Sequence, residues 1–231
     1  MLTAGSSAVV ESLTVLFNLI LDSGHSPSQW QAGVMTMTPK DGDLTDWSNY
    51  RSITLLSLVG KLFESIIAER IFLALEARGR IPAEQGGFWR SFGQSDHIFI
   101  LSESIKYRAR RGRCTYCAFL DIRKAFPTMH RASMLAALSR VGIGGKVWRA
   151  VERMYSSTST RIALRGALSD SYLVDTGLRE GSVMSPILYS VPSPGEWHSS
   201  KNFWWIFLAS TVLESRDRAL QCGIGHSSRA W

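Results

Sequence analysis

The sequence predicts an α+β fold, and two patterns carry that prediction. Apolar residues recur at helical spacing over residues 7–22 and 58–78, and Gly79 stands just beyond the second pattern. Apolar and polar residues alternate, as in a half-buried strand, from residue 31 to a turn at 39–42. They alternate again on both sides of a turn within 160–176. A chain of 231 residues, 45% of them hydrophobic, can bury a substantial core.

Each helix is expected to bury one apolar face. For the first helix that face is Val10, Leu13, Leu16, Phe17 and Ile20, and for the second it is Leu62, Ile66, Ile67, Ile71 and Leu75. The remaining elements follow from the same periodicities: short strands at 53–56 and 116–121, helices over 95–110, 131–141 and 146–155, and a loop that becomes helical within 177–189.

The charge balance favours an anionic partner. Lys and Arg number 26 against 19 Asp and Glu, which gives a net charge of +7. Nucleic acid is the first expectation and an acidic membrane surface the second. The longest apolar run, Phe203 to Leu213, is too short to span a bilayer, so we expect no membrane anchor.

Cysteine usage points to an intracellular protein, either nuclear or cytoplasmic. Three cysteines do not form a closed disulfide framework. Cys114 and Cys117 form a CxxC in an apolar, strand-like run that no second CxxC or paired histidines follow. We therefore expect a buried structural pair rather than a zinc site.

Asp121 is the first candidate for chemistry, because it directly follows the apolar run 117–120. A carboxylate at the end of a strand can present oxygens to Mg²⁺. It can equally cap a turn or pair with Arg123 or Lys124, and the residues alone leave both readings open.

Other stretches supply groups suited to phosphates. Arg51 and Lys40 are isolated cations near the first two strands, and residues 179–182 form a Gly/Ser loop that leads into a helix. A basic run completes the set: Lys106, Arg108, Arg110, Arg111 and Arg113. Such a run is also typical of a solvated helix face.

Four colinear stretches resemble the reverse transcriptase of non-LTR (LINE-type) retrotransposons. They are TPKDGDLTDWSNYRSITLLSLVGKLFESIIAERI (38–71), PAEQGGFWRSFGQSDHIFIL (82–101), YCAFLDIRKAF (116–126) and TGLREGSVMSPILYSV (176–191). The resemblance covers about residues 10–191. It implies the fingers and first part of the palm of a right-hand polymerase, with a helical lead-in at 1–30, fingers at 31–115, an incomplete palm at 116–191 and a non-family, poorly ordered tail at 192–231.

The resemblance also implies roles for individual residues. Asp121 matches the first catalytic aspartate, which binds two Mg²⁺ ions in the family, and the carbonyl of Ile122 is expected to ligate the ion on the nucleotide side. Phe126 matches the aromatic residue that excludes ribonucleotides, although the residues alone favour an ordinary core aromatic. Arg51 matches the arginine that contacts the incoming dNTP, and Lys40 lies in the preceding turn, where it can equally be a solvated residue.

The other matched motifs imply contacts with an RNA template and a DNA primer. Gln85, Gly86 and Phe88 match a stretch near the template strand. Gly181 and Ser182 match the motif that supports template and nucleotide.

The sequence departs from the family pattern in three places, and the third decides the predicted activity. Glu180 stands where the family usually has Gln, and Pro127 where many members have Asp. The Asp-Asp pair of the next palm motif is missing: the sequence contains no two adjacent aspartates. One carboxylate cannot organise two divalent cations, so we expect that this polypeptide does not polymerise.

Two alternatives stay open. The chain can be a non-catalytic remnant that binds RNA or DNA through its basic fingers. An unrelated phosphotransfer enzyme with an aspartate nucleophile would need a second acid at position 123, which is Arg123 here.

Overall fold

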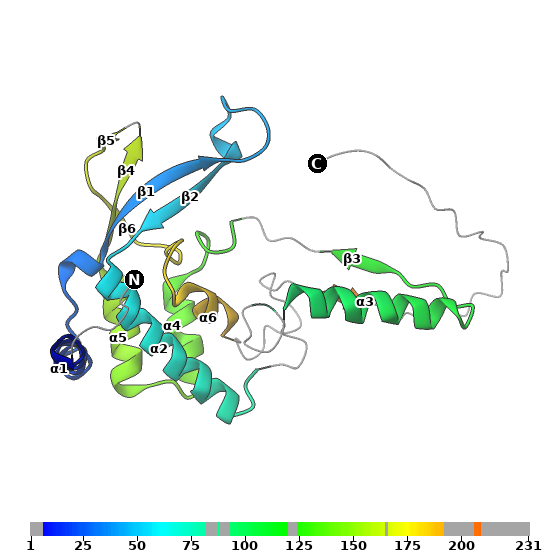
Figure 1. Ribbon diagram of the computed structural model, residues 1–231, viewed down its shortest axis with the longest axis horizontal. Helices are drawn as coiled ribbons and strands as arrows, with labels where there is room; N and C mark the ends of the chain where they lie inside the picture. Colours follow the sequence, from blue (N-terminus) through cyan, green and yellow to red (C-terminus); the bar gives the residue numbers. More distant parts are fainter. Residues whose placement is uncertain are drawn as a thin grey trace.

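The computed structural model describes residues 7–81, 87, 93–119, 124–164, 166–191 and 206–208. Within these residues the fold is mixed α+β, as predicted, with a five-stranded sheet lying over a group of helices (Figure 1).

The main sheet brings together strands from both halves of the chain. Its strands are β1 (Ala32–Pro39), β2 (Tyr50–Leu55), β4 (Thr158–Leu164), β5 (Ala167–Leu168) and β6 (Tyr172–Val174). Their order is β2-β1-β4-β5, with β6 also paired to β4, so β2 is an edge strand. β1 runs antiparallel to β2 and parallel to β4. The sheet is therefore shared between the predicted fingers and palm regions.

The helices match the predicted segments closely. They are α1 (Ser7–Ser23), α2 (Leu58–Ala77), α3 (Gln94–Ala109), α4 (Arg131–Arg140), α5 (Gly145–Ser156) and α6 (Ser185–Ser190), with short 3-10 helices η1 (Ser28–Trp30) and η2 (Trp47–Asn49). Local sequence explains the ends of α2. The Ser57 side chain accepts a hydrogen bond from the Gly60 amide, and Gly79, at φ +58°, follows the last turn.

The core lies where α1, α2, α4, α5 and α6 pack together. Phe17, Trp30 and Phe63 form an aromatic group with ring centroids 5.4–6.2 Å apart. The other large apolar side chains that are almost fully buried come from α2, α4, α5, α6 and the residue before α6: Ile67, Ile71, Leu75, Leu138, Val151, Met154, Met184 and Leu188.

Two predicted core positions are wrong. Val10 is 59% exposed because it lies in the first turns of α1, ahead of the residues that pack on the core. Ile66 is also on the surface, since the buried face of α2 runs through Phe63, Glu64 and Ile67 instead. An apolar run with several possible helical faces does not specify which face packs.

The expectation of a buried cysteine pair is also wrong. Cys114 and Cys117 are both exposed free thiols. The reason is the position of β3 (Cys117–Phe119), which lies outside the main sheet. Among the described segments β3 pairs only with β7 (Ile206–Leu208), in an antiparallel register.

β7 is the one described segment of the predicted tail; the rest of 192–231 lies outside the described residues. None of the helices in the described ranges is both long enough and apolar enough to cross a bilayer.

Candidate functional site

Strand β2 has two chemically different faces. Arg51, Ile53 and Leu55 are exposed, whereas Ser52 is half-buried and Thr54 is buried. This is the alternation of a strand with one covered face. Ile53 and Leu55 are 47% and 58% exposed, so the Arg51 guanidinium shares its face with two aliphatic side chains in contact with solvent.

Lys40 lies where β1 turns towards β2. Its amide donates to the Asn49 carbonyl at 2.7 Å, and its ammonium donates to the Ser48 carbonyl at 3.2 Å. The ammonium therefore stabilises the turn, which agrees with the interpretation of Lys40 as a turn residue. Its contact with a nucleotide stays a prediction.

The loop that contains Gly181 lies against the free edge of β2. The Thr54 amide donates to the Glu180 carbonyl at 2.9 Å, and the Ser52 hydroxyl donates to the Glu180 carboxylate. Gly181 has φ +112°, and a Cβ there would lie 2.3 Å from the Thr54 carbonyl oxygen. Only glycine allows the loop to approach the strand this closely.

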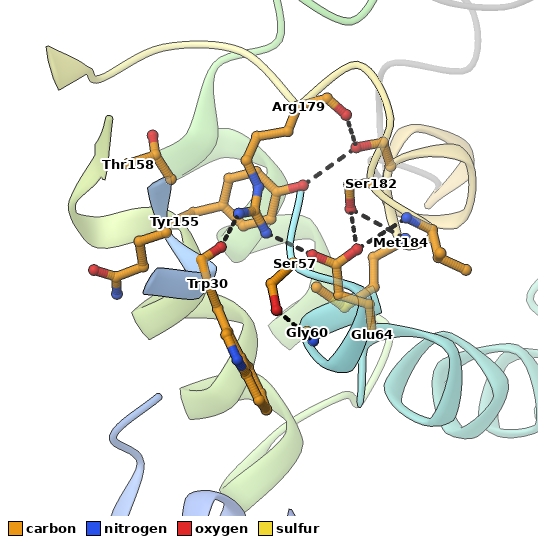
Figure 2. A network of polar contacts seen from close by, with 12 residues as sticks. Trp30, Ser57, Gly60, Glu64, Tyr155, Thr158, Arg179, Ser182 and Met184 are labelled. Carbon is orange, nitrogen blue, oxygen red and sulfur yellow. Dashed lines mark hydrogen bonds and ion pairs between the residues drawn. The ribbon is translucent and has the colours of Figure 1, made fainter. Parts of the chain in front are cut away.

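A buried ion pair fixes the same loop from beneath (Figure 2). Arg179 Nη2 donates to Glu64 Oε1 at 2.6 Å, and the two side chains are only 6% and 2% exposed. Arg179 Nη1 also donates to the Trp30 carbonyl at 2.7 Å. A carboxylate and a guanidinium removed from water in this way need each other, because either one alone would be an unpaired buried charge.

Ser182 belongs to this network. Its hydroxyl donates to Glu64 Oε2 at 2.7 Å and accepts from the Met184 amide at 3.2 Å. The Val183 amide donates to the same carboxylate oxygen at 2.9 Å. Glu64 thus receives three donors from the loop, and Ser182 faces inward while its neighbour Gly181 is exposed.

A second guanidinium, that of Arg131 at the start of α4, stabilises the segment of chain that leads into the loop. It donates to the carbonyls of Gly177, Val174 and Tyr155 at 2.8–2.9 Å and to the Thr158 hydroxyl at 2.9 Å. Burial lowers the pKa of Arg131, and the positive charge of nearby Arg179 acts in the same direction. Its donors, all directed to neutral oxygens, tie α4, α5 and β6 together.

A cavity of about 170 Å³ lies between the inner face of the sheet and residues 176–180. Five residues with hydroxyl groups contribute to its lining: Ser52, Thr54, Thr158, Thr160 and Thr176. Arg131, Arg179 and Glu180 supply the charged part of its wall. The cavity lies on the face of β2 opposite to Arg51.

Phe126 occupies a turn that packs on the core. Its ring meets Tyr189 edge to face, with centroids 5.4 Å apart and planes at 71°, and its carbonyl accepts from the Leu178 amide at 2.8 Å. The ring is half-buried, so the core-packing reading describes part of its role. The proposed exclusion of ribonucleotides stays a prediction.

Comparison with known proteins identifies the family. The sequence profile described as reverse transcriptase (RNA-dependent DNA polymerase) matches residues 38–192. The chain belongs to the reverse transcriptase family.

Named relatives agree with the non-LTR resemblance. The chain is 32% identical over 168 residues to the Pol polyprotein of a type-1 retrotransposable element R2 from Popillia japonica, which covers 72% of this chain and 23% of that protein. It is 27% identical over 183 residues to the RNA-directed DNA polymerase of mobile element jockey from Drosophila melanogaster, covering 79% of this chain and 20% of the relative. The chain thus spans less than a quarter of the length of these relatives.

Several predicted site residues of this chain lie outside the described residues. They are Asp121, Ile122, Gln85, Gly86 and Phe88. Within the described ranges, no group of three or more His, Cys, Asp or Glu side chains could hold a metal ion.

The basic run from Lys106 to Arg113, called the basic cluster from here on, lies at the C-terminal end of α3. This helix is separate from the main sheet (Figure 1). Two members have local structural contacts: Lys106 pairs with Glu103 at 2.8 Å, and Arg108 donates to the Cys114 carbonyl at 3.1 Å. Arg110, Arg111 and Arg113 are exposed, and the Arg111 guanidinium stacks 4.1 Å from the centroid of the Tyr107 ring.

Sequence reasoning missed Glu64, Arg179, Arg131 and Ser52. Glu64 carried a usable signal, because it lies at helical spacing among the apolar residues Phe63, Ile67 and Ile71. An acid on an apolar helix face requires a buried partner. Nothing local indicated that the partner is Arg179, 115 residues away.

Proposed function

We propose that residues 38–191 are the fingers and first part of the palm of a retrotransposon RNA-directed DNA polymerase. The observation that carries this proposal is the seating of loop 177–184 on the edge of β2. Gly181 is pressed against Thr54, three residues along the same strand from Arg51. Arg51 and Gly181, far apart in sequence, thereby meet at the same edge strand, which supports the proposal that both serve nucleotide binding.

In this proposal each group has a simple task. The Arg51 guanidinium binds the triphosphate of the incoming dNTP, for which its planar fork of donors is suited. The exposed Ile53 and Leu55 side chains offer an apolar surface to a base, and the open backbone at Gly181 allows close approach. In the intact family Mg²⁺ supplies the electrophilic assistance to phosphoryl transfer.

These 231 residues by themselves are proposed not to synthesise DNA. They contain Asp121, which matches the first catalytic aspartate of the family, and no adjacent aspartate pair. Two divalent cations between phosphates need more negative charge than one carboxylate supplies.

A second candidate, nucleic-acid binding without catalysis, is favoured by the exposed Arg110, Arg111 and Arg113. Both candidates predict binding of an RNA–DNA hybrid that weakens steeply as salt rises. They differ from an active polymerase in a primer-extension assay with Mg²⁺ and dNTPs, where we expect no incorporation. Extension that is lost in Asp121→Ala would refute the proposed inactivity, and the absence of any hybrid binding would refute both candidates.

A further inference from the structure

The side chain of Glu180 is directed away from the face on which Arg51 lies. Ser52 and Thr54 belong to the inner face of β2, and both contact Glu180: the Ser52 hydroxyl donates to its carboxylate, and the Thr54 amide donates to its carbonyl at 2.9 Å. Glu180 is half-buried and lines the inner cavity.

The backbone around Glu180 is held from both sides. The next residue, Gly181, lies so close to Thr54 that a Cβ there would be 2.3 Å from the Thr54 carbonyl oxygen, and the preceding residue, Arg179, is paired with Glu64. With its neighbours fixed, residue 180 has mainly side-chain torsions with which to choose a direction. The hydroxyl donor of Ser52 stabilises the inward direction because hydrogen bonds to a carboxylate are strong ones.

The charges on the cavity wall favour the same direction. Arg131 and Arg179 both line the cavity, and no other carboxylate among the described residues lines it with Glu180. On the outer face, an ionised acid beside Arg51 would instead weaken the attraction of that guanidinium for phosphate.

We infer that Ser52 is a positioning residue that keeps the Glu180 carboxylate out of the phosphate-binding face of β2. This inference rests on the proposed function for the role of Arg51, but the Ser52–Glu180 coupling itself does not. Ser52 acts through residue 180 and touches no substrate.

A double-mutant cycle tests the coupling. Ser52→Ala, Glu180→Ala and the double variant are compared with the parent chain in urea unfolding followed by circular dichroism. A hydrogen bond to a charged group predicts a coupling of about tenfold or more in the unfolding equilibrium constant. Effects that simply multiply would overturn the pairing, whether or not the protein binds nucleic acid.

Binding separates a positioning role from a merely structural one. Affinity for a fluorescently labelled dNTP is measured by anisotropy, at two salt concentrations, on the chain bound to an RNA–DNA hybrid with a recessed DNA 3′ end. Ser52→Ala is expected to weaken binding about threefold to tenfold, because the released carboxylate repels phosphate. Adding Glu180→Gln should restore affinity, since no charge is left to release.

Controls make each outcome decisive. Ser52→Thr keeps the hydroxyl and should bind like the parent, and Ser12→Ala removes a hydroxyl that bonds only within α1, to the Ala8 carbonyl at 2.7 Å. A Ser52→Ala/Glu180→Gln variant that folds but binds as weakly as Ser52→Ala would overturn the positioning role. dNTP binding absent in every variant would count against the proposed function, and the unfolding cycle would still decide the coupling.

Discussion

Removing the Glu64 carboxylate should strongly destabilise the protein. Glu64→Ala leaves the Arg179 guanidinium, the Ser182 hydroxyl and the Val183 amide buried without their acceptor. Breaking a buried ion pair by deleting one partner costs about 3–5 kcal/mol. That is a large fraction of the roughly 5–15 kcal/mol that stabilises a typical domain.

Glu64→Gln is a sharper version of the same test. The amide keeps the shape of the side chain, yet it presents a donor where the loop supplies three donors. We expect a loss of about 2–4 kcal/mol, close to the effect of Glu64→Ala, because the pairing fails even though the volume is conserved.

Urea unfolding of the purified chain measures both effects. With an m-value of about 2–3 kcal/mol per molar, the Glu64→Ala midpoint should fall by about 1–2 M. Glu76→Ala is the matched control, because Glu76 lies on the same helix with its side chain exposed, and we expect a change within about 0.5 kcal/mol. If Glu64→Ala lowered the midpoint no more than Glu76→Ala, the ion pair would not anchor the loop as described.

Three further predictions concern the loop, the core and the basic cluster. Gly181→Ala should lower the free energy of unfolding in urea by about 2–4 kcal/mol, because the added Cβ meets the Thr54 carbonyl. The control is Gly112→Ala, at φ +66° with open space around it, which should cost about 1 kcal/mol. Equal costs for the two variants would contradict the close approach of Gly181 to the strand. Burial raises the pKa of Tyr189, so the folded state holds the phenol proton more tightly than the unfolded state does, and stability should fall as pH rises above about 10. Tyr189→Phe should flatten that fall and leave stability at pH 7 unchanged or up to about 1 kcal/mol higher, since the hydroxyl is buried without a hydrogen-bond partner among the described residues; a pH profile identical to the parent's would refute this. Replacing Arg110, Arg111 and Arg113 together by Gln should weaken hybrid binding and reduce the slope of log affinity against log salt by about 2–3, as read by anisotropy; an equal loss on replacing the exposed Arg140, Arg149 and Arg153 of α4 and α5 would show that the cluster at α3 has no special role.

Local sequence was sufficient for most of the secondary structure. The helix over 58–78 and the hairpin strands within 160–176 were predictable because periodicity, a capping serine and turn glycines agree with each other. The face that α2 buries was less predictable, as the exposed Ile66 and buried Glu64 illustrate. Which face packs depends on the neighbours that the helix meets.

The candidate site divides in the same way. Arg51, Gly181 and Phe126 were found from motif residues, because a family pattern marks positions along the chain. Those positions did not reveal that Gly181 lies against the strand that carries Arg51. The contact joins residues more than a hundred positions apart. Of the buried partners of the loop, Arg131 lies outside every motif, and Glu64 lies within the stretch 38–71 without a role implied by the resemblance.

The sequence by itself determined the family, the basic charge and the order of helices and strands. The family follows from four colinear motifs, the charge from composition, and the helices and strands from local periodicity. The tertiary structure alone decided that β1 pairs with β4, that Glu64 is neutralised by Arg179, and that the acid at Glu180 turns inward to Ser52. The physical reason is that a hydrogen bond or ion pair depends on the final positions of both partners. Those positions are set by how the whole core packs.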